Sequence, residues 1–249
     1  DVSGALALPG VFAAISGADF PGGGIEGEVG GEGGGTLDDV AKNVMARDKV
    51  LYHGHAVAAV AAATPMVAEA ALAAIKVEYE PLAPVLDVLE AMAPDATLVD
   101  ENNYTKLPEK PEHPSNGANQ GRLERGNIEE GFAAADVVVE REFKCPMAHQ
   151  GYIEPHACVG QLGQDGKGEM WICTQGHWFI RKMCASVLGL EASQLRVTPS
   201  EIGGGFGGKT TIFSEALSLA LSRKSGGRPV KLVMTRPEVL RATGPTASA

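Results

Sequence analysis

Short apolar runs, separated by polar and glycine-rich segments, predict a mixture of strands and helices. Apolar runs too short for a helix predict strands at residues 11–16, 49–52, 56–63, 76–79, 137–143, 157–162, 169–174, 195–197 and 230–234. Apolar residues at helical spacing predict helices over residues 64–75, 128–135, 177–188 and 213–223. The mixture predicts an α+β fold.

Local signals fix several element ends. Thr64 followed by Pro65 is typical of a helix start, with threonine as the N-cap and proline at the first helical position. Gly189 marks the end of the helix that begins near residue 177. The turn sequence at residues 163–166 joins two strand candidates and predicts a β-hairpin.

The composition changes at two places along the chain. Residues 22–35 are rich in glycine and carry three glutamates, so we expect a flexible surface loop there. Residues 105–126 are polar and include three prolines, which predicts a linker between two domains, residues 1–104 and 127–249. Because the sequence begins without methionine and ends soon after a strand candidate, we expect a fragment truncated at both ends.

Charge and composition exclude some functions. Of 249 residues, 44% are hydrophobic, which is enough for a core, and no apolar stretch is long enough to span a bilayer. The net charge of -10 argues against a nucleic-acid-binding surface. The four cysteines form no C-x-x-C pair and lie in apolar surroundings, so we expect buried free thiols and a reducing compartment, the cytoplasm.

One glycine-rich run, residues 203–210 with the sequence GGGFGGKT, carries the candidate chemistry. Backbone N–H groups without neighbouring side chains can approach an anionic oxygen closely, so the run predicts a cradle for an anion or a cofactor. Taken alone it fits a P-loop, a dinucleotide-binding turn and a molybdenum hydroxylase loop, and a simple chain turn is a fourth interpretation.

The flanking residues separate these interpretations. A P-loop follows a buried strand, but residues 198–202 are polar and contain a proline. The later strand candidate at residues 230–234 ends without the aspartate that would help to hold magnesium. A dinucleotide site needs an acidic residue about 20 positions further on, where residues 224–228 supply none. Both nucleotide interpretations are therefore disfavoured.

Several motifs occur in one order along the chain. In the second half they are Ile153–Val159 with its Glu-Pro pair, Thr174–Gln175 before a helix, Ile202–Lys209, and Arg228–Lys231 with Thr235–Arg236. These motifs resemble the first molybdopterin-binding domain of the xanthine dehydrogenase and aldehyde oxidase family. The first half, through Val50–Val60, Ala68–Ala74 and Val77–Leu82, resembles the a/b hammerhead domain of the same family.

The resemblance implies a hammerhead domain followed by the first part of a molybdopterin-binding domain. It implies that the large subunit holds a molybdenum–molybdopterin cofactor and hydroxylates a carbon centre with oxygen from water. The backbone of Phe206 would then donate to an oxygen on the metal, and the cofactor-binding glycines would be Gly204, Gly205, Gly207 and Gly208. A core aromatic is the alternative interpretation of Phe206. No metal ligand from the protein is implied, and we expect His149 and His156 to be hydrogen-bonded or solvated.

Two positions depart from the family pattern. Some members carry a substrate-contacting glutamate where this chain has Thr210, which disfavours a purine and favours an aldehyde or an aromatic N-heterocycle as substrate. The family glutamine that hydrogen-bonds a metal oxygen lies six residues before the glutamate of the strand entry. That position is Ala148 here, and Gln150 is the candidate replacement.

The resemblance also implies parts that residues 1–249 lack. No residue matches the family's glutamate base, so we expect no catalytic residue within this chain and no turnover by it alone. Electrons would pass to 2Fe-2S and FAD groups on partner chains or segments. The cofactor would take the cytosine dinucleotide form if the protein is bacterial. A non-catalytic binding module of the same fold is the alternative, and Ala148 is the residue that favours it.

Overall fold

The computed structural model describes residues 1–21, 23–29, 35–107, 109, 111–244 and 246. The chain divides into two compact units, one formed by Asp1–Glu78 with His149–Thr246 and one formed by Tyr79–Ala148. The first unit therefore contains two segments that are far apart in the sequence.

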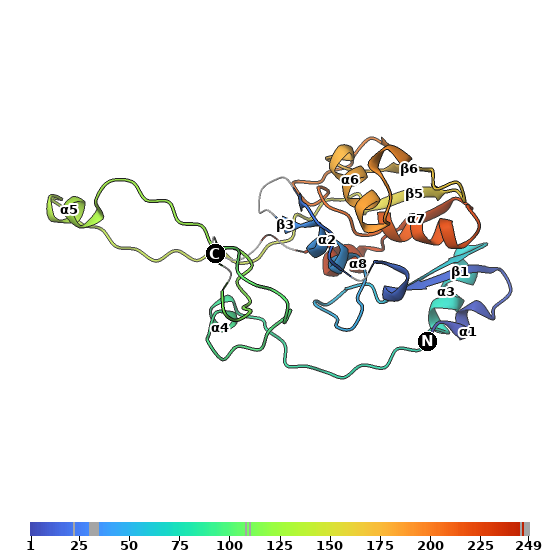
Figure 1. Ribbon diagram of the computed structural model, residues 1–249, viewed down its shortest axis with the longest axis horizontal. Helices are drawn as coiled ribbons and strands as arrows, with labels where there is room; N and C mark the ends of the chain where they lie inside the picture. Colours follow the sequence, from blue (N-terminus) through green and yellow to red (C-terminus); the bar gives the residue numbers. More distant parts are fainter. Residues whose placement is uncertain (22, 30–34, 108, 110, 245, 247–249) are drawn as a thin grey trace. The chain divides into compact units, whose positions relative to one another are not determined.

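A four-stranded sheet is the largest element of the first unit (Figure 1). Its strand order is β7-β6-β5-β8, in which β5 pairs antiparallel with β6 and β8, and β6 pairs parallel with β7. The bounds are β5 Ala157–Leu162, β6 Gly168–Ile172, β7 Leu195–Pro199 and β8 Val230–Val233. The predicted hairpin is confirmed, and side chains alternate between a buried face and a more exposed face, as the period of a strand requires.

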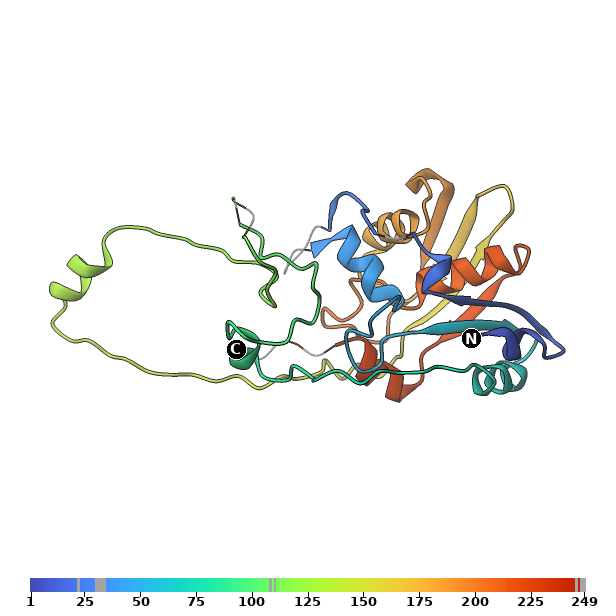
Figure 2. The same ribbon diagram turned by 60° about the horizontal axis from the view of Figure 1, so that its bottom comes forward.

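Two helices cover the buried face of this sheet. They are α6 His177–Val187 and α7 Glu215–Lys224. The residues from Glu215 to Ser222 of α7 are all buried, because β1 Val11–Ser16 and β4 Ala58–Ala62 also pack against this helix. Strands β1 and β4 pair antiparallel, and Figure 2 shows them side by side near α7.

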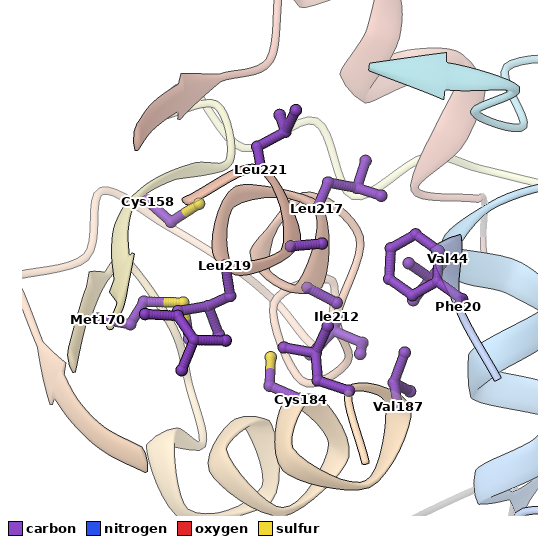
Figure 3. Packing of buried hydrophobic residues seen from close by; sticks show 14 of the residues in the cluster. Phe20, Val44, Cys158, Met170, Cys184, Val187, Ile212, Leu217, Leu219 and Leu221 are labelled. Atoms are coloured by element: carbon purple, nitrogen blue, oxygen red, sulfur yellow. The ribbon is translucent and has the colours of Figure 1, made fainter. Parts of the chain in front are cut away.

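The core joins both sequence segments of the first unit. Ile15 of β1 and Leu219 of α7 are at most 1% exposed and belong to one buried cluster. Figure 3 shows α7 between the sheet on one side and Phe20 with Val44 on the other. Val44 lies in α2 Leu37–Val44, which packs against α6. The remaining elements of this unit are α1 Ser3–Leu6, η1 Gly17–Asp19, β2 Glu28–Val29, β3 Gly35–Thr36, α3 Pro65–Ala73, η2 Ala192–Gln194 and α8 Arg236–Ala242.

The second unit runs mostly without helix or strand. It contains α4 Val88–Ala91, α5 Ile128–Ala133 and an isolated bridge between Lys106 and Asn119. Large apolar side chains in it are exposed, and Leu123 is 98% exposed. A membrane-spanning helix, long and apolar enough for the purpose, does not occur among the residues that the structure describes.

Several expectations about elements were wrong. Residues 49–52, 76–79 and 137–143 form no strand, because none of these runs finds a hydrogen-bonding partner strand in the described part of the chain. The glycine-rich segment is not wholly a loop, since β2 and β3 pair across it; residues 22 and 30–34 lie outside the described residues. All four cysteines are free as expected, but Cys145 is exposed rather than buried.

Candidate functional site

The glycine run forms a loop between β7 and α7. Phe206 has φ 50° and is followed by Gly207 at φ +86°, and Gly204, two residues before it, has φ +94°; among the described residues Phe206 is the one non-glycine residue with positive φ. Glycine adopts such backbone angles without strain, and a loop of this kind can present backbone N–H groups to an anion. The Phe206 side chain is 73% exposed, so the interpretation of Phe206 as a core aromatic is wrong.

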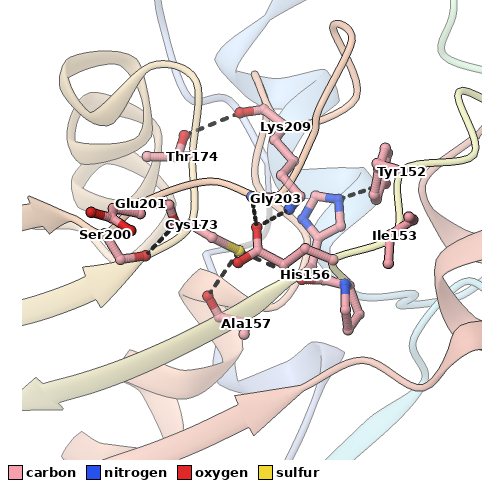
Figure 4. Close-up of polar contacts among 12 residues, drawn as sticks. Tyr152, Ile153, His156, Ala157, Cys173, Thr174, Ser200, Glu201, Gly203 and Lys209 are labelled. Atoms are coloured by element: carbon pink, nitrogen blue, oxygen red, sulfur yellow. Dashed lines mark hydrogen bonds and ion pairs between the residues drawn. The ribbon is translucent and has the colours of Figure 1, made fainter.

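Two side-chain acceptors hold the loop at its ends. One carboxylate oxygen of Glu154 accepts the N–H of Gly203 at 2.8 Å and the ammonium of Lys209 at 2.6 Å. The carboxamide oxygen of Gln175 accepts the N–H of Gly207 at 3.1 Å and the N–H of Lys209 at 3.2 Å. The backbone of the run is thus fixed by residues from two other segments. Figure 4 shows Gly203 and the Lys209 ammonium meeting at one carboxylate, and the hydrogen bond between Thr174 and Lys209.

Glycine is required inside the loop because neighbouring side chains press against it. A Cβ on Gly205 would lie 2.5 Å from the carboxamide oxygen of Gln175, and a Cβ on Gly208 would lie 2.6 Å from Cε1 of Tyr152. Both distances are shorter than any ordinary van der Waals contact. A simple turn needs no such packing, so the glycines serve a closely fitted loop.

Three consecutive N–H groups of the loop have no partner in the part of the chain that the structure describes. The N–H groups of Gly207 and Lys209 are bound by Gln175, and that of Gly208 donates to the carbonyl of Gly205 at 2.8 Å. Those of Gly204, Gly205 and Phe206 donate to none of the described residues. Consecutive unpaired N–H groups in a loop suit an anionic oxygen.

Gln150 lies against this loop. Its carboxamide carbon is 3.4 Å from the point where a Cβ on Gly208 would stand. Its carboxamide oxygen is buried and has no hydrogen-bond partner among the described residues. A buried acceptor without a donor is costly, so this oxygen is available to accept a hydrogen bond from a bound group. Sequence and structure thus bring Gln150 and the glycine run together.

The ammonium of Lys209 is paired with groups of the protein itself. Lys209 is 1% exposed, and its ammonium also lies 5.1 Å from the centre of the Tyr152 ring. Burial raises the pKa of Glu154, but the hydrogen bonds from Lys209 and Gly203 outweigh it and hold this pKa below its ordinary value. A P-loop lysine instead reaches the phosphates of a nucleotide. The buried ion pair therefore argues against the P-loop interpretation.

A buried polar network lies behind the loop. The Tyr152 hydroxyl is 2.8 Å from Nε2 of His156 and 2.9 Å from the hydroxyl of Thr243, and His149 contacts that same threonine hydroxyl at 3.0 Å. Burial, together with the nearby charge of Lys209, lowers the pKa of His156 to about 4. Both histidines are hydrogen-bonded, as expected. No cluster of metal-ligating side chains occurs among the residues that the structure describes.

Thr210 is exposed beside the loop. Its hydroxyl donates to the carbonyl of Gly207 at 2.9 Å. Sequence reasoning missed the holding contacts of Gln175 and Glu154 and the role of Tyr152. The Thr-Gln pair before a predicted helix and the Glu-Pro pair were visible signals, but neither showed what it would contact.

The chain matches two families of domains. Residues 109–248 match the molybdopterin cofactor-binding domain, and residues 1–83 match the a/b hammerhead domain of aldehyde oxidase and xanthine dehydrogenase.

Among curated proteins, the chain is similar to a probable xanthine dehydrogenase subunit of Bacillus subtilis. The two are 34% identical over 80% of this chain and 25% of that protein. It is also similar to the carbon monoxide dehydrogenase large chain of Afipia carboxidovorans, with 32% identity over 98% of this chain and 30% of that protein. The chain thus spans less than a third of these relatives.

Solved structures of related enzymes share the fold of this chain. The aldehyde oxidoreductase of Desulfovibrio gigas matches with a TM-score of 0.76 at 26% identity, over 100% of this chain and 26% of that one. Quinoline 2-oxidoreductase of Pseudomonas putida 86 matches with a TM-score of 0.74 at 27% identity, over 96% of this chain and 29% of that one. The expected α+β fold, a hammerhead domain followed by molybdopterin-binding sequence, is confirmed. The chain belongs to the aldehyde oxidase and xanthine dehydrogenase family of molybdopterin-dependent oxidoreductases.

Proposed function

We propose that the glycine run and Gln150 form one wall of the site for a molybdenum–molybdopterin cofactor. The observation that carries this proposal is the set of three consecutive N–H groups, at Gly204, Gly205 and Phe206, that are unpaired within the described part of the chain, on a loop that Gln150 contacts. The buried oxygen of Gln150, which has no partner among the described residues, would accept a hydrogen bond from an N–H or O–H donor of the same group.

The residues of this chain then have distinct tasks. When bound, the cofactor supplies two-electron redox chemistry in which water is the source of the oxygen atom. The N–H groups of Gly204, Gly205 and Phe206 donate to anionic oxygens of the bound group and fix its orientation. The buried carboxamide oxygen of Gln150 accepts a hydrogen bond from a donor group of the cofactor. Lys209 stays with Glu154 and keeps the loop in place.

The substrate that we propose is an aldehyde or an aromatic N-heterocycle. Thr210 offers an exposed, neutral hydroxyl where a purine-specific carboxylate would be charged. Relatives that act on such compounds, by name, include an aldehyde oxidoreductase and a quinoline 2-oxidoreductase. Electrons would pass to 2Fe-2S and FAD groups on partner chains or segments, and a bacterial protein would carry the cytosine dinucleotide form of the cofactor.

We also propose that two sequence domains, residues 1–104 and 127–249, are joined by a linker at residues 105–126; the matches to residues 1–83 and 109–248 support a change of domain between residues 83 and 109, while the compact units of the structure divide the chain at other places. The four free cysteines support a reducing compartment, such as the cytoplasm.

The test compares two glycines with matched backbones. Gly207 has φ +86° and Gly226 has φ +81°, and a Cβ on either would meet nothing within 4 Å. Alanine therefore brings similar backbone strain at both positions, but only Gly207 lies next to the unpaired N–H groups of the glycine run. In the full-length protein, made in a host that synthesises the cofactor, we expect Gly207→Ala to lower the molybdenum and pterin content several-fold. Gly226→Ala should leave both unchanged.

The outcomes separate the proposal from its alternatives. Equal molybdenum content in the two variants would place the cofactor away from the loop. A full-length wild-type protein without molybdenum and pterin would favour the non-catalytic binding module of the same fold.

A further inference from the structure

Gln175 is tied to the glycine run by its backbone as well as by its side chain. It lies between β6 and α6, directly before Gly176, the N-cap of α6. Its N–H donates to the carbonyl of Lys209 at 3.0 Å, and the hydroxyl of Thr174 donates to the same carbonyl at 3.1 Å. The junction between strand and helix therefore fixes the position of Gln175 relative to Lys209.

The side chain of Gln175 uses its full acceptor capacity on the run. A carboxamide oxygen has two lone pairs, and here the oxygen accepts the N–H groups of Gly207 and Lys209. The N–H of Gly208 is bound within the loop. Every N–H group from residue 207 to residue 209 is thus hydrogen-bonded. Gln175 therefore determines where the run of unpaired N–H groups, residues 204–206, ends.

The same side chain also supports the middle of the loop. A Cβ on Gly205 would lie 2.5 Å from Oε1, 2.7 Å from Cδ and 3.0 Å from Cγ of Gln175. The carboxamide therefore rests against the backbone of Gly205, beside the free N–H groups. Because closely packed atoms resist compression, the carboxamide keeps Gly205 from moving toward α6.

We propose that Gln175 is a positioning residue for the cofactor site. It occupies the N–H groups of Gly207 and Lys209 and supports Gly205, so that only the N–H groups of residues 204–206 face the cofactor. This inference rests on the proposed function of the loop. Gln175 itself makes no contact with the cofactor in this arrangement.

The test uses two variants of Gln175 and one matched control in the full-length protein. Gln175→Leu removes the acceptor, while Gln175→Glu keeps an oxygen at the same reach. Gln194→Leu is the control, because the Gln194 oxygen also accepts a backbone N–H, that of Glu191 at 2.8 Å, away from the run. Amide hydrogen exchange over residues 203–210 and molybdenum content per polypeptide are measured for each.

We expect Gln175→Leu to accelerate exchange at Gly207 and Lys209 by about five-fold or more, the effect of losing one hydrogen bond of ordinary strength. It should also lower the molybdenum content, and Gln175→Glu, which keeps the acceptor oxygen, should restore slow exchange toward wild type. Gln194→Leu should change neither.

Three results would overturn the proposal. Unchanged exchange in Gln175→Leu would mean that the carboxamide does not hold the loop. Faster exchange with full molybdenum content would leave Gln175 a purely structural role. Failure of Gln175→Glu to restore slow exchange would exclude the acceptor as the cause. If the wild type itself lacks molybdenum, the proposed function fails and this inference fails with it, while the exchange data still show whether Gln175 holds the loop.

Discussion

At the scale of single residues, His156 is the most unusual titratable group behind the site. It is 1% exposed, contacts the Tyr152 hydroxyl and lies edge-on to the Phe213 ring, with 5.1 Å between the centres. Its pKa is lowered from 6.5 to about 4, first by burial and then by the charge of Lys209. The folded protein therefore holds this imidazole in its neutral form at neutral pH.

The lowered pKa predicts a loss of stability in acid. Below pH 6.5 the unfolded chain binds a proton at His156 that the folded protein refuses until about pH 4, so the free energy of unfolding falls across this interval. Between pH 7 and pH 5 the contribution of His156 amounts to about 2 kcal/mol. Urea unfolding at both pH values measures this effect. The free energy of unfolding should fall by about 2 kcal/mol more in the wild type than in His156→Asn between pH 7 and pH 5.

An exposed histidine provides the comparison. His113 has a side chain that is 83% exposed, and His113→Asn serves as the control substitution outside the buried network. The explanation would be wrong if His156→Asn and the wild type lost equal stability on acidification.

Some site residues could be predicted from sequence and others could not. Residues 203–209 and Gln150 could be proposed as site residues from sequence because glycine spacing and motif order are local properties. The holding contacts join residues 34 positions apart for Gln175 with Lys209 and 49 apart for Glu154 with Gly203. Periodicity and local motifs carry no information on such pairs, so the acceptors were not assigned.

At the scale of elements, predictions succeeded where local chemistry and packing agreed. The helix after Thr64 was correct because the threonine hydroxyl accepts the N–H of Val67 at 3.2 Å, as an N-cap does. Helix α2 was missed although Thr36 and Asp39 form a capping box before it. The strand predicted at residues 137–143 was wrong because apolar, β-branched residues become a strand only when a partner supplies the ladder.

The contact between β5 and α7 supports a prediction at this scale. A Cβ on Gly160 of β5 would lie 2.6 Å from the Ser218 hydroxyl and 3.1 Å from Cδ2 of Leu219. That hydroxyl is held by a 2.8 Å hydrogen bond to the carbonyl of Val230 and cannot move freely. We expect Gly160→Ala to lower the free energy of unfolding by about 1–3 kcal/mol, the usual effect of overpacking.

Chemical denaturation measures this change, with Gly131→Ala as the control. A Cβ on Gly131 in α5 meets nothing within 4 Å. Alanine favours a helix over glycine, so the control should be neutral or slightly stabilising. A similar destabilisation in both variants would show that steric contact at Gly160 is not the cause.

At the scale of the whole molecule, the chain closes its first unit across a long separation in sequence. Residues 1–78 and 149–246 share one hydrophobic cluster, to which Ile15 and Phe20 come from the first segment and Ile180 and Leu219 from the second. An ion pair of 2.5 Å between Asp19 and Lys224 also joins the segments. The composition indicated a linker near residues 105–126, but only long-range packing could show that the segments on either side of residues 79–148 form one core.

This shared core predicts that the two segments stay associated when the chain between them is cut. A protease site introduced at residues 121–126, which form no helix or strand, should yield two pieces that co-elute in size-exclusion chromatography. Burial of a charge in the cluster should separate them, because an unpaired buried carboxylate costs several kcal/mol. We therefore expect Ile15→Asp, at a position 1% exposed, to release the pieces after cleavage, and Leu72→Asp, at a position 50% exposed, to leave them together. Separation of the cleaved protein that carries neither substitution, without denaturant, would mean that continuity of the chain, and not the core, holds the first unit together.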